Sequence, residues 1–438
     1  MRERERRRGG DGPAVESLVR RAAGPSRAPG PRARSRDGVI VVGAGAAGLA
    51  AAIFARRAGA RVSLLESTGN PGQKILISGG GRCNVLPSRF EPERFVSETP
   101  RIAARLLKSW RLESVRSFFE DELAIPLALE AESGKLFPVS NRARDVRDAL
   151  LREAESAGVE VERSARVVGV ETSPLCVVLA GEERRAARAV VLATGGLSIP
   201  RTGSDGAGLA IVRRLGHRVV EPYPALTPLR TDRPEHRALA GVSLDVAIRA
   251  GGRGSASSSS SGGFLFTHGG YSGPAVLDLS HRVVRDPGTV LRVSWTAMTE
   301  SEWEERLRNA PGGAGVEGVV ARHVPARLAK TLAAEAGIDP GETVARLRRD
   351  SRLRLIEALV RYPLPVSGHE GFAKAEVTGG GVSLDEIDPV TLESRRIPGL
   401  HLCGEILDAF GPIGGHNFLW AWVTGRAAGL SAARTRGR

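Results

Sequence analysis

Residues 38–55 read GVIVVGAGAAGLAAAIFA, a stretch of 18 residues without a charge. Length alone would make it a marginal membrane span, since a helix needs about 20 apolar residues to cross a bilayer. Its internal pattern favours another structure: the β-branched run 39–42 predicts a buried strand, and the glycine-spaced stretch 43–48 predicts a turn into a helix. A second predicted strand over 61–65 ends at Glu66. This order of elements is typical of a dinucleotide-binding unit, so we expect no membrane span.

The three glycines of this turn and the acid after it each suit one part of a dinucleotide. Gly43 permits the tight turn, Gly45 lets the backbone approach a pyrophosphate, and Gly48 lets the helix pack against the strand. The start of the helix offers free N–H groups to the phosphates. Glu66 can accept hydrogen bonds from an adenosine ribose and would repel a 2′-phosphate. The alternative is a turn with a purely structural role.

The segment 71–85, PGQKILISGGGRCNV, favours FAD over NAD as the dinucleotide. Its glycine run at 79–81 allows the backbone to lie close to a flat ring, where any Cβ would collide. The alternative is a flexible glycine loop. Cys83 within the segment is interpreted as a small buried thiol without reactivity. The polar side chains around the glycines are Lys74, Ser78, Arg82 and Asn84.

The pattern then changes twice along the chain. Up to residue 216 helical and strand-like runs alternate, and the glycines at 203–208 do not follow a strand as a second dinucleotide motif would. We therefore expect no separate nicotinamide domain. Between 222 and 293 short β-like runs alternate with turns, and 251–263, GGRGSASSSSSGG, predicts a flexible strand connection. Residues 300–361 are helical in pattern, with 11 basic and 10 acidic side chains, a balance that argues against a nucleic-acid-binding face there.

The C-terminal part returns to the first pattern. Residues 400–403 predict a buried strand that Gly404 and Glu405 close, and a helix opens at 414–415. A last strand and helix that arrive after so much inserted sequence indicate a discontinuous flavin domain. Glu405 would accept hydrogen bonds from ribityl hydroxyls, and the helix start at 415–417 would direct its dipole at the flavin pyrimidine. The alternative is an ordinary strand–helix unit.

Composition limits the remaining possibilities. A chain of 438 residues suggests about two to four domains. Its three cysteines form no C-x-x-C pair and no HExxH motif is present, so we expect no metal site. The few, widely spaced cysteines also fit a protein of the reducing cytoplasm, which is the location we expect. The formal charge is +14, and residues 1–36 hold 11 arginines against 4 acidic residues, which predicts a disordered basic arm. This arm is either a dispensable extension or an attraction for nucleic acid or a membrane surface.

Several motifs resemble those of one flavoprotein family. Over about residues 38–430 the chain is similar to bacterial FAD-binding flavoproteins of the aminoacetone-oxidase-like group, which are Rossmann-fold oxidoreductases. Leu86 and Leu419 depart from the family pattern and leave the substrate open. The motifs are ISGGGRCN (77–84), GKLFPVSNRA (134–143), ATGGLSIPRTGSDGAG (193–208), LFTHGGYSGPAVLDLS (265–280), AEVTGGGV (375–382) and GEILDAFGPIGGHNFLWAW (404–422).

The resemblance implies an α/β architecture in three parts. A discontinuous Rossmann FAD domain of the glutathione-reductase type carries an inserted β-barrel-like domain, and that domain carries a helical insert. The expected boundaries are 1–36 for the basic arm, 37–215 and 372–438 for the FAD domain, 216–298 and 350–371 for the β-barrel insert, and 299–349 for the helical insert.

FAD is the expected cofactor, bound non-covalently, with NAD(P)H as a transient reductant. The motifs and the resemblance together predict these residues at the FAD: Gly43, Gly45, Ala46, Ala47, Gly48, Glu66, Lys74, Gly80, Gly81, Arg82, Cys83, Asn84, Val167, Thr194, Gly195, Gly404, Glu405, Asp408, Gly415, His416 and Asn417.

Three side chains are candidates for the chemistry. His268 and Tyr271 lie in FTHGGYSGP (266–274), a motif-like turn that could present proton donors to the flavin. His416 lies at the helix start beside the presumed flavin. Each of the two histidines has an alternative role as a hydrogen-bonded structural residue.

Three functions remain open. The first is a flavin-dependent oxidoreductase acting on a small organic molecule, by amine oxidation or by redox at carbon–carbon or carbonyl groups. The second is a flavoprotein that acts on or with RNA, as similar FAD domains do in tRNA modification. The third is an FAD-binding regulator without catalysis. We favour the first, which makes a nucleic-acid partner the less favoured one and leaves the oligomeric state open.

Overall fold

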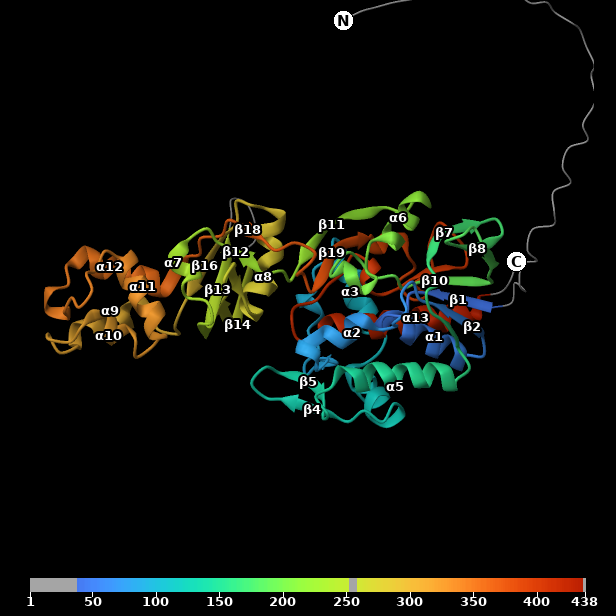
Figure 1. Cartoon of the computed structure of the whole chain (residues 1–438), viewed down its shortest axis with the longest axis horizontal. Helices are drawn as coiled ribbons and strands as arrows, with labels where there is room; N and C mark the ends of the chain where they lie inside the picture. Colours follow the sequence, from blue (N-terminus) through green and yellow to red (C-terminus); the bar gives the residue numbers. More distant parts are fainter. Residues whose placement is uncertain (1–37, 252–257, 436–438) are drawn as a thin grey trace, which may run out of the picture.

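A five-stranded parallel sheet lies at the centre of the larger part of the molecule (Figure 1), in the order β20-β10-β1-β2-β6. The computed structural model describes residues 38–251 and 258–435, so the arm predicted at 1–36 falls outside the described residues. The strands are β1 (Gly38–Val42), β2 (Arg61–Leu65), β6 (Glu160–Glu162), β10 (Ala189–Leu192) and β20 (Leu400–Leu402). The last of them comes from the far end of the chain, so the α/β part is discontinuous, as the sequence predicted.

The first strand and helix form as the sequence predicted. β1 is β-branched and nearly all of it is buried, which suits a parallel strand covered on both faces. It pairs with β2 on one side and with β10 on the other. Helix α1 (Ala46–Arg57) follows the glycine turn, and its alanines and glycines present a thin surface to its neighbours.

Helix α13 (His416–Arg434) packs closely on α1, although the two helices are far apart in the sequence. The contact is made at two glycines of α13. A Cβ on Gly425 would lie 2.3 Å from the carbonyl oxygen of Ala47, and one on Gly429 would lie 2.2 Å from that of Ala51. These distances are too short for any side chain. The glycines therefore allow two backbones to meet and attach the C-terminal helix to the first motif.

Gly425→Val is expected to lower the free energy of unfolding by about 3 kcal/mol, because the added side chain must push α13 away from α1. Urea unfolding of the full-length protein measures the change. Gly318→Ala in helix α10 (Val316–Val320) is the control, since a Cβ there meets nothing within 4 Å. Equal stability of the two variants would contradict the close packing.

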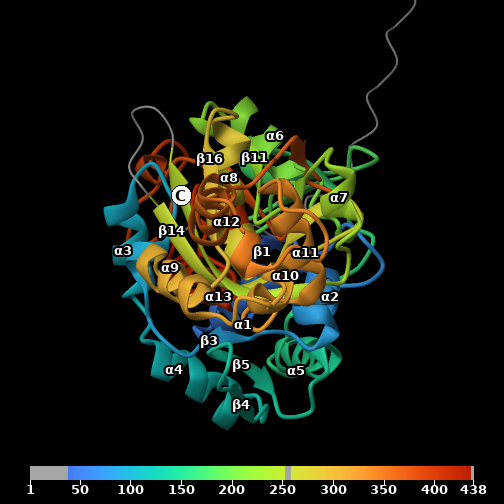
Figure 2. The ribbon, with the colours of Figure 1, turned by 90° about the vertical axis from the view of Figure 1, so that its left-hand side faces the viewer.

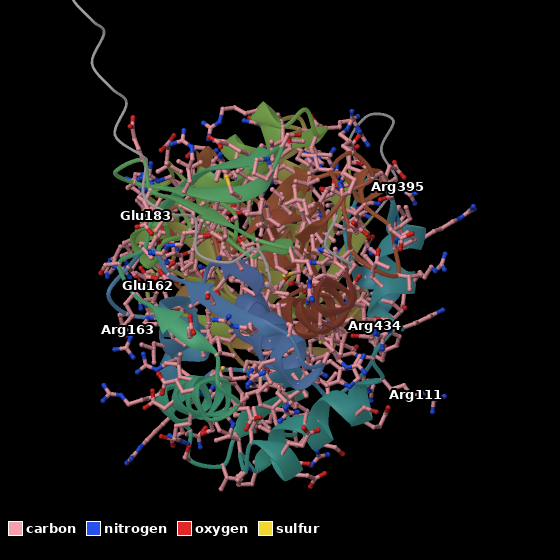
Figure 3. All side chains as sticks on the ribbon, turned by 90° about the vertical axis from the view of Figure 1, so that its right-hand side faces the viewer. Arg111, Glu162, Arg163, Glu183, Arg395 and Arg434 are labelled. Carbon is pink, nitrogen blue, oxygen red and sulfur yellow. The ribbon has the colours of Figure 1, made fainter. Side chains whose placement is uncertain are left out.

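Further elements surround the central sheet. Two small antiparallel sheets flank it, β3-β5-β4 and β7-β8-β9. Figure 3 views the molecule from the end that holds the parallel sheet, where Arg111 and Arg434 are exposed. The bounds are α2 (Gln73–Ile77), α3 (Pro100–Leu107), α4 (Leu112–Ser117), α5 (Ala143–Ser156), α6 (Ala207–Arg214), β3 (Leu86–Pro87), β4 (Leu127–Glu130), β5 (Lys135–Pro138), β7 (Val167–Thr172), β8 (Leu175–Leu179) and β9 (Arg184–Ala186).

A second sheet, antiparallel and seven-stranded, lies beside the α/β part (Figure 1), in the order β17-β16-β13-β14-β15-β12-β18. Its two edge strands follow one another in the sequence, so the sheet curves into a barrel-like shape. The chain enters and leaves through the antiparallel pair β11 (Val219–Ala225) and β19 (Val377–Val382). The sheet contains β12 (Leu229–Arg230), β13 (Ser243–Gly251), β14 (Ser258–Phe266), β15 (Gly270–Ser272), β16 (Val290–Ser294), β17 (Tyr362–Pro363) and β18 (Gly368–His369).

Helices form the end of the molecule beyond this sheet (Figures 1 and 2). They pack with the seven-stranded sheet in one hydrophobic core, and the α/β part has a core of its own. The exact boundaries of the three predicted domains stay a prediction. The helices are α7 (Pro234–Arg237), α8 (Pro274–Arg285), α9 (Glu300–Asn309), α10, α11 (Ala326–Glu335) and α12 (Arg349–Arg361), with α7 and α8 against the sheet.

The serine-rich stretch corrects a sequence prediction. Residues 258–263, expected to belong to a flexible loop, begin β14, and they pair with β13 through Ala250 opposite Ser258. Pairing with a neighbouring strand decides this structure, and composition does not reveal it. Helix α8 was also not predicted, although Pro274 at its first position is a common helix start. Among the helices of the described residues, none has the length and apolar character that crossing a bilayer requires.

Candidate functional site

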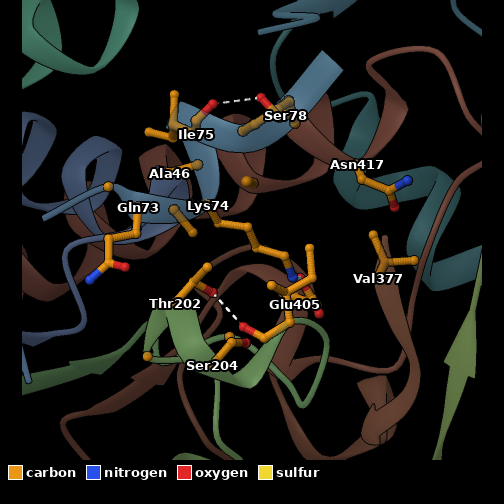
Figure 4. A pocket seen from close by; sticks show the side chains of 18 of the residues that line it. Ala46, Gln73, Lys74, Ile75, Ser78, Thr202, Ser204, Val377, Glu405 and Asn417 are labelled. Carbon is orange, nitrogen blue, oxygen red and sulfur yellow. Dashed lines mark hydrogen bonds and ion pairs between the residues drawn. The ribbon is translucent and has the colours of Figure 1, made fainter. Parts of the chain in front are cut away.

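A cavity of about 660 Å³ lies where the carboxyl ends of β1, β2 and β10 meet helix α2 and the start of α13 (Figure 4). The carboxyl edge of a parallel sheet is the usual ligand site in α/β folds. The cavity continues to Leu226 and Glu376, at the junction with the seven-stranded sheet. It therefore runs from the first motif to the insert.

The glycine turn opens directly into this cavity. Gly43 has φ +98°, and a Cβ there would lie 2.6 Å from the carbonyl oxygen of Ala193. The first helical hydrogen bond of α1 belongs to Leu49, which donates to the Gly45 carbonyl at 2.9 Å. Earlier N–H groups have no side-chain cap, and Ala46 and Ala47 line the cavity. This arrangement suits an anionic group such as a pyrophosphate.

Glu66 closes one end of the cavity and is nearly buried. Its carboxylate accepts hydrogen bonds from the backbone N–H of Ala44 at 2.9 Å and of Thr68 at 2.8 Å. These two bonds orient the acid and tie the glycine turn to β2. Val167 and Gly203 line the same region of the cavity. Glu66 thus lines the cavity as the sequence predicted, and its role at an adenosine ribose stays a prediction.

A partly buried ionic network lines the cavity. The Lys74 ammonium is 2.7 Å from the Glu405 carboxylate and also contacts Ser198. Glu405 further accepts hydrogen bonds from Ser198 Oγ at 2.6 Å and Thr378 N at 3.0 Å. Burial opposes ionisation of Glu405, but the charge of Lys74 and these hydrogen bonds hold its pKa below the usual range. The acid is thus a fixed acceptor for hydroxyl groups of a ligand.

The far end of the cavity lies at the start of α13. Gly415 has φ +91°, and Asn84, with its amide oriented for hydrogen bonding, accepts from Gly415 N at 2.9 Å and donates to Leu86 O at 3.1 Å. Asn417 bonds both backbone groups of Gly411 at 2.9 Å. The glycine-rich segment and α13 are thereby held together. Asn417 lines the cavity, and its amide is bonded to the Gly411 backbone.

The residues present fit a bound dinucleotide. The hydroxyls of Thr194 and Ser204 line the cavity and are buried without a hydrogen-bond partner in the described residues. Buried polar atoms normally have partners, so a ligand with polar groups would satisfy them. The uncapped start of α1 and the acid at Glu66 add sites for a phosphate and a ribose. The cavity volume is within the range of roughly 300–1,000 Å³ for small-molecule sites.

Most of the predicted cofactor residues line this one cavity. They are Gly43, Gly45, Ala46, Ala47, Glu66, Lys74, Gly80, Arg82, Asn84, Val167, Thr194, Gly195, Glu405, Gly415 and Asn417. Six others do not line it: Gly48, Gly81, Cys83, Gly404, Asp408 and His416.

Packing explains why some of these six predicted residues do not line the cavity. A Cβ on Gly48 would lie 1.8 Å from the Gly43 carbonyl oxygen, and one on Gly404 would meet the Ala47 side chain at 2.7 Å. Both glycines allow close backbone contact behind the cavity. Asp408 accepts a hydrogen bond from Glu98 N at 2.9 Å. Burial raises the pKa of the Cys83 thiol to about 12, which agrees with its interpretation as unreactive.

The three candidate catalytic side chains lie elsewhere. Tyr271 is fully buried in the core of the seven-stranded sheet, and its hydroxyl is bonded to His236 Nδ1 at 2.7 Å. The prediction that it faces the flavin is therefore corrected: it is a core residue. His268 is exposed in the turn between β14 and β15. His416 is buried beside Phe95, and burial lowers its pKa to about 4.

Sequence reasoning missed several residues of the cavity. Ser198 and Thr378 complete the network around Glu405, and Lys135 and Glu376 line the end near the insert. All four lie in motifs of the family resemblance, namely GKLFPVSNRA, ATGGLSIPRTGSDGAG and AEVTGGGV, and these motifs were the available signal. No single-sequence pattern distinguishes which of their side chains turn inward.

Comparison with known proteins gives this site a family. The family described as "HI0933-like protein Rossmann domain" matches residues 37–431. The chain belongs to this FAD-binding Rossmann family. The fold predicted from the sequence, a discontinuous Rossmann α/β domain of the FAD-binding type, is confirmed.

Similar proteins carry two kinds of name. The ribosomal RNA dihydrouridine synthase of Escherichia coli K12 is 33% identical over 88% of this chain and 96% of its own. The 3-dehydro-bile acid delta(4,6)-reductase of Clostridium scindens is 31% identical over 90% of this chain and 98% of its own. A second ribosomal RNA dihydrouridine synthase, from Haemophilus influenzae, is 30% identical over 90% and 98%. These relatives are thus named for two classes of substrate, ribosomal RNA and a bile acid.

Solved structures resemble the chain more distantly. A flavocytochrome c3 fumarate reductase in its open conformation is 18% identical, with a TM-score of 0.49, and the match covers 93% of this chain and 79% of that one. A 3-ketosteroid-delta4-(5alpha)-dehydrogenase from Rhodococcus jostii RHA1 is also 18% identical, with a TM-score of 0.47, over 90% and 96%.

Proposed function

We propose that this protein is an FAD-dependent reductase that saturates a carbon–carbon double bond conjugated to a carbonyl group. All three relatives named above carry names of such reactions. Dihydrouridine is uridine with its ring double bond saturated, and a delta(4,6)-reductase saturates double bonds beside the 3-oxo group of its substrate. This is the carbon–carbon branch of the function that the sequence favoured. None of these relatives is named for amine oxidation, so the aminoacetone-oxidase-like assignment stays a prediction.

The structural observation that supports the proposal is one cavity lined by the glycine turn, Glu66 and Glu405 and also by Lys135 and Glu376. In the proposed arrangement Glu66 binds the adenosine ribose and the start of α1 binds the pyrophosphate. Glu405, held by Lys74, accepts from the ribityl chain, and Asn84, Gly415 and Asn417 surround the ring. FAD supplies the two electrons of the reaction when it is bound.

The substrate end of the cavity is lined by apolar and basic side chains. Phe137, Leu226 and Ile413 line it together with Lys135. The Arg82 guanidinium stacks on the Phe137 ring at 4.0 Å and pairs with Glu130 at 2.9 Å. An apolar wall with two basic side chains, Arg82 and Lys135, suits a flat, uncharged ring whose carbonyl oxygen accepts a hydrogen bond. A small organic molecule is our first candidate substrate.

A uracil ring within RNA is the second candidate. Two of the relatives are named for ribosomal RNA, and the chain has a formal charge of +14. A uracil ring contains the same conjugated unit, so the chemistry of the cavity would be unchanged. A positively charged protein attracts the phosphate backbone, and the attraction weakens steeply with salt.

An anaerobic experiment tests the proposal and separates the candidates. The purified yellow protein is reduced with dithionite and mixed with 2-cyclohexen-1-one, a 3-oxo-4-ene steroid or an unmodified ribosomal RNA transcript. We expect one of them to restore the absorption of oxidised flavin and to be recovered with its double bond saturated. Reoxidation by RNA alone would select the second candidate. Bleaching of the oxidised protein by an amine, with no reoxidation by the three acceptors, would overturn the proposal in favour of amine oxidation.

The physiological reductant is tested with the same preparation. We propose NADH or NADPH, which would enter the cavity only transiently because the chain carries one dinucleotide motif. Stoichiometric bleaching of the flavin by one of the two is the expected result. If neither NADH nor NADPH bleaches the flavin, the electron donor is another molecule.

A further inference from the structure

Glu376 lies on the cavity wall immediately before β19, where the chain returns from the seven-stranded sheet. Its backbone N–H donates to the Leu226 carbonyl oxygen at 3.1 Å. Leu226 and Val377 line the cavity beside it. Glu376 is thus held at the substrate end, between the α/β part and the insert.

Its carboxyl group differs from the other acids of the cavity. Four acidic side chains line the cavity, and in the described residues three of them have a hydrogen bond or an ion pair with the protein. Glu66 accepts from two backbone N–H groups, Glu405 pairs with Lys74, and Asp205 pairs with Arg166 at 2.7 Å. Within those same residues the Glu376 carboxyl has neither a hydrogen bond nor an ion pair. Such a group is available to a ligand.

The surroundings of Glu376 favour its neutral form. Its side chain is exposed to solvent at the cavity wall. Desolvation by the neighbouring protein raises the pKa of this carboxyl, and the charges of Lys74 on α2 and Lys135 on β5 oppose the rise without cancelling it. Lys74 is itself neutralised by Glu405. A carboxyl group with a raised pKa keeps its proton more readily than a free glutamic acid, and in its protonated form it is a proton donor.

We propose that Glu376 is the catalytic acid that protonates the substrate during saturation of its double bond. The inference rests on the function proposed above. Saturation adds two electrons and two hydrogens to the conjugated unit. One hydrogen arrives with both electrons at the carbon far from the carbonyl, and the π electrons move toward the carbonyl oxygen. The carbon next to the carbonyl then takes a proton as the Glu376 O–H bond breaks.

The two lysines complete the cycle on the protein side. The carboxylate that Glu376 becomes is stabilised by the charges of Lys74 and Lys135, the same charges that oppose the rise of its pKa. Water entering the cavity returns the proton. Lys135 lines the same end of the cavity, where its ammonium group can donate to the carbonyl oxygen as charge accumulates there.

Glu376→Gln tests this role, because glutamine keeps the shape and cannot deliver the proton. Loss of a general acid typically slows a reaction by about 10²–10⁴-fold. We expect that loss in reoxidation of the reduced holoenzyme by its unsaturated acceptor, with FAD content and reoxidation by dioxygen unchanged. The control is Glu370→Gln, a carboxyl on the same returning segment that does not line the cavity. It should reoxidise at the wild-type rate.

A second readout does not depend on turnover. Infrared difference spectra of the oxidised holoenzyme across pH should contain a protonated-carboxyl band that titrates at raised pH and is missing in Glu376→Gln. The wild-type reoxidation rate should fall as pH rises through the same transition, because only the neutral acid is active. Should the glutamine variant lose FAD, Glu376→Asp replaces it, with a slower rate and the pH dependence retained.

The outcomes separate the two proposals. If an unsaturated acceptor reoxidises the wild type and Glu376→Gln equally fast, Glu376 is not the acid and the proposed function stands. A pH-independent wild-type rate would have the same meaning. If no unsaturated acceptor reoxidises the wild type, both proposals fail together.

Discussion

Glu66→Arg is expected to weaken FAD binding by at least roughly 100-fold. The substitution removes a charge-assisted hydrogen bond to the ribose, worth about 1.5–3 kcal/mol, and it places a cation in a nearly buried site. It also leaves the N–H groups of Ala44 and Thr68 without their acceptor. Titration of the FAD-stripped protein with FAD, followed by flavin fluorescence, measures the loss.

The control for Glu66→Arg makes the same charge change at Glu305, an exposed position on α9. That variant should bind FAD like the wild type. Glu66→Gln should lie between the two, because it keeps one acceptor and loses the charge. Normal FAD binding by Glu66→Arg would remove Glu66 from the proposed ribose site.

Lys74→Met is expected to destabilise the protein by about 2–3 kcal/mol at neutral pH. The change leaves the Glu405 carboxylate, largely enclosed by protein, without its cation, and removal of one partner of a buried ion pair is costly. We set the value below the range for fully buried pairs because both side chains keep some contact with the cavity. Urea unfolding of the full-length protein, with and without added FAD, gives the free energy of unfolding.

The double variant Lys74→Met with Glu405→Gln isolates the pair. It should recover most of the lost stability, because no uncompensated charge remains. If the double variant lost as much stability as the two single variants together, Lys74 and Glu405 would not be coupled.

The pH dependence of the same variants has a defined sign. In the wild type the folded-state pKa of Glu405 is lowered, so the pair stabilises the fold at neutral pH and loses this effect as pH falls through that pKa. In Lys74→Met we expect burial to raise the pKa of Glu405 instead, so that protonation removes the unpaired charge. The stability difference between wild type and Lys74→Met should therefore narrow on acidification. A constant difference would contradict an ionised Glu405.

Local sequence was sufficient for the first half of the cofactor site. β1, the glycine turn, α1 and β2 lie within 28 consecutive residues, and the predicted strand 61–65 matches β2 at both ends. Contacts between residues close in the sequence determine the structure of this unit. Gly43 turns at positive φ, and Glu66 follows the strand that positions it. Such signals depend on neighbours in the sequence, so they can be read without the fold.

The second half depended on contacts between distant residues. Lys74 and Glu405 are 331 positions apart, and Ser198 and Thr378 join them from two further segments. Glu405 could be assigned from its motif, but its partners could not. The serine-rich start of β14 is a strand only because β13 pairs with it.

The sequence by itself determined the fold class and indicated most of the predicted cofactor residues that line the cavity, because these follow from glycine spacing and strand–helix order. Tertiary structure alone decided which polar side chains face the cavity. His268 and Tyr271 share a motif, yet one is exposed in a turn and the other is buried in a core. Glu376 lies in the motif AEVTGGGV (375–382), but nothing in that motif indicates that its side chain lines the cavity without a partner in the described residues. Whether a polar side chain meets solvent, core or cavity depends on what packs against it, and that partner comes from elsewhere in the chain.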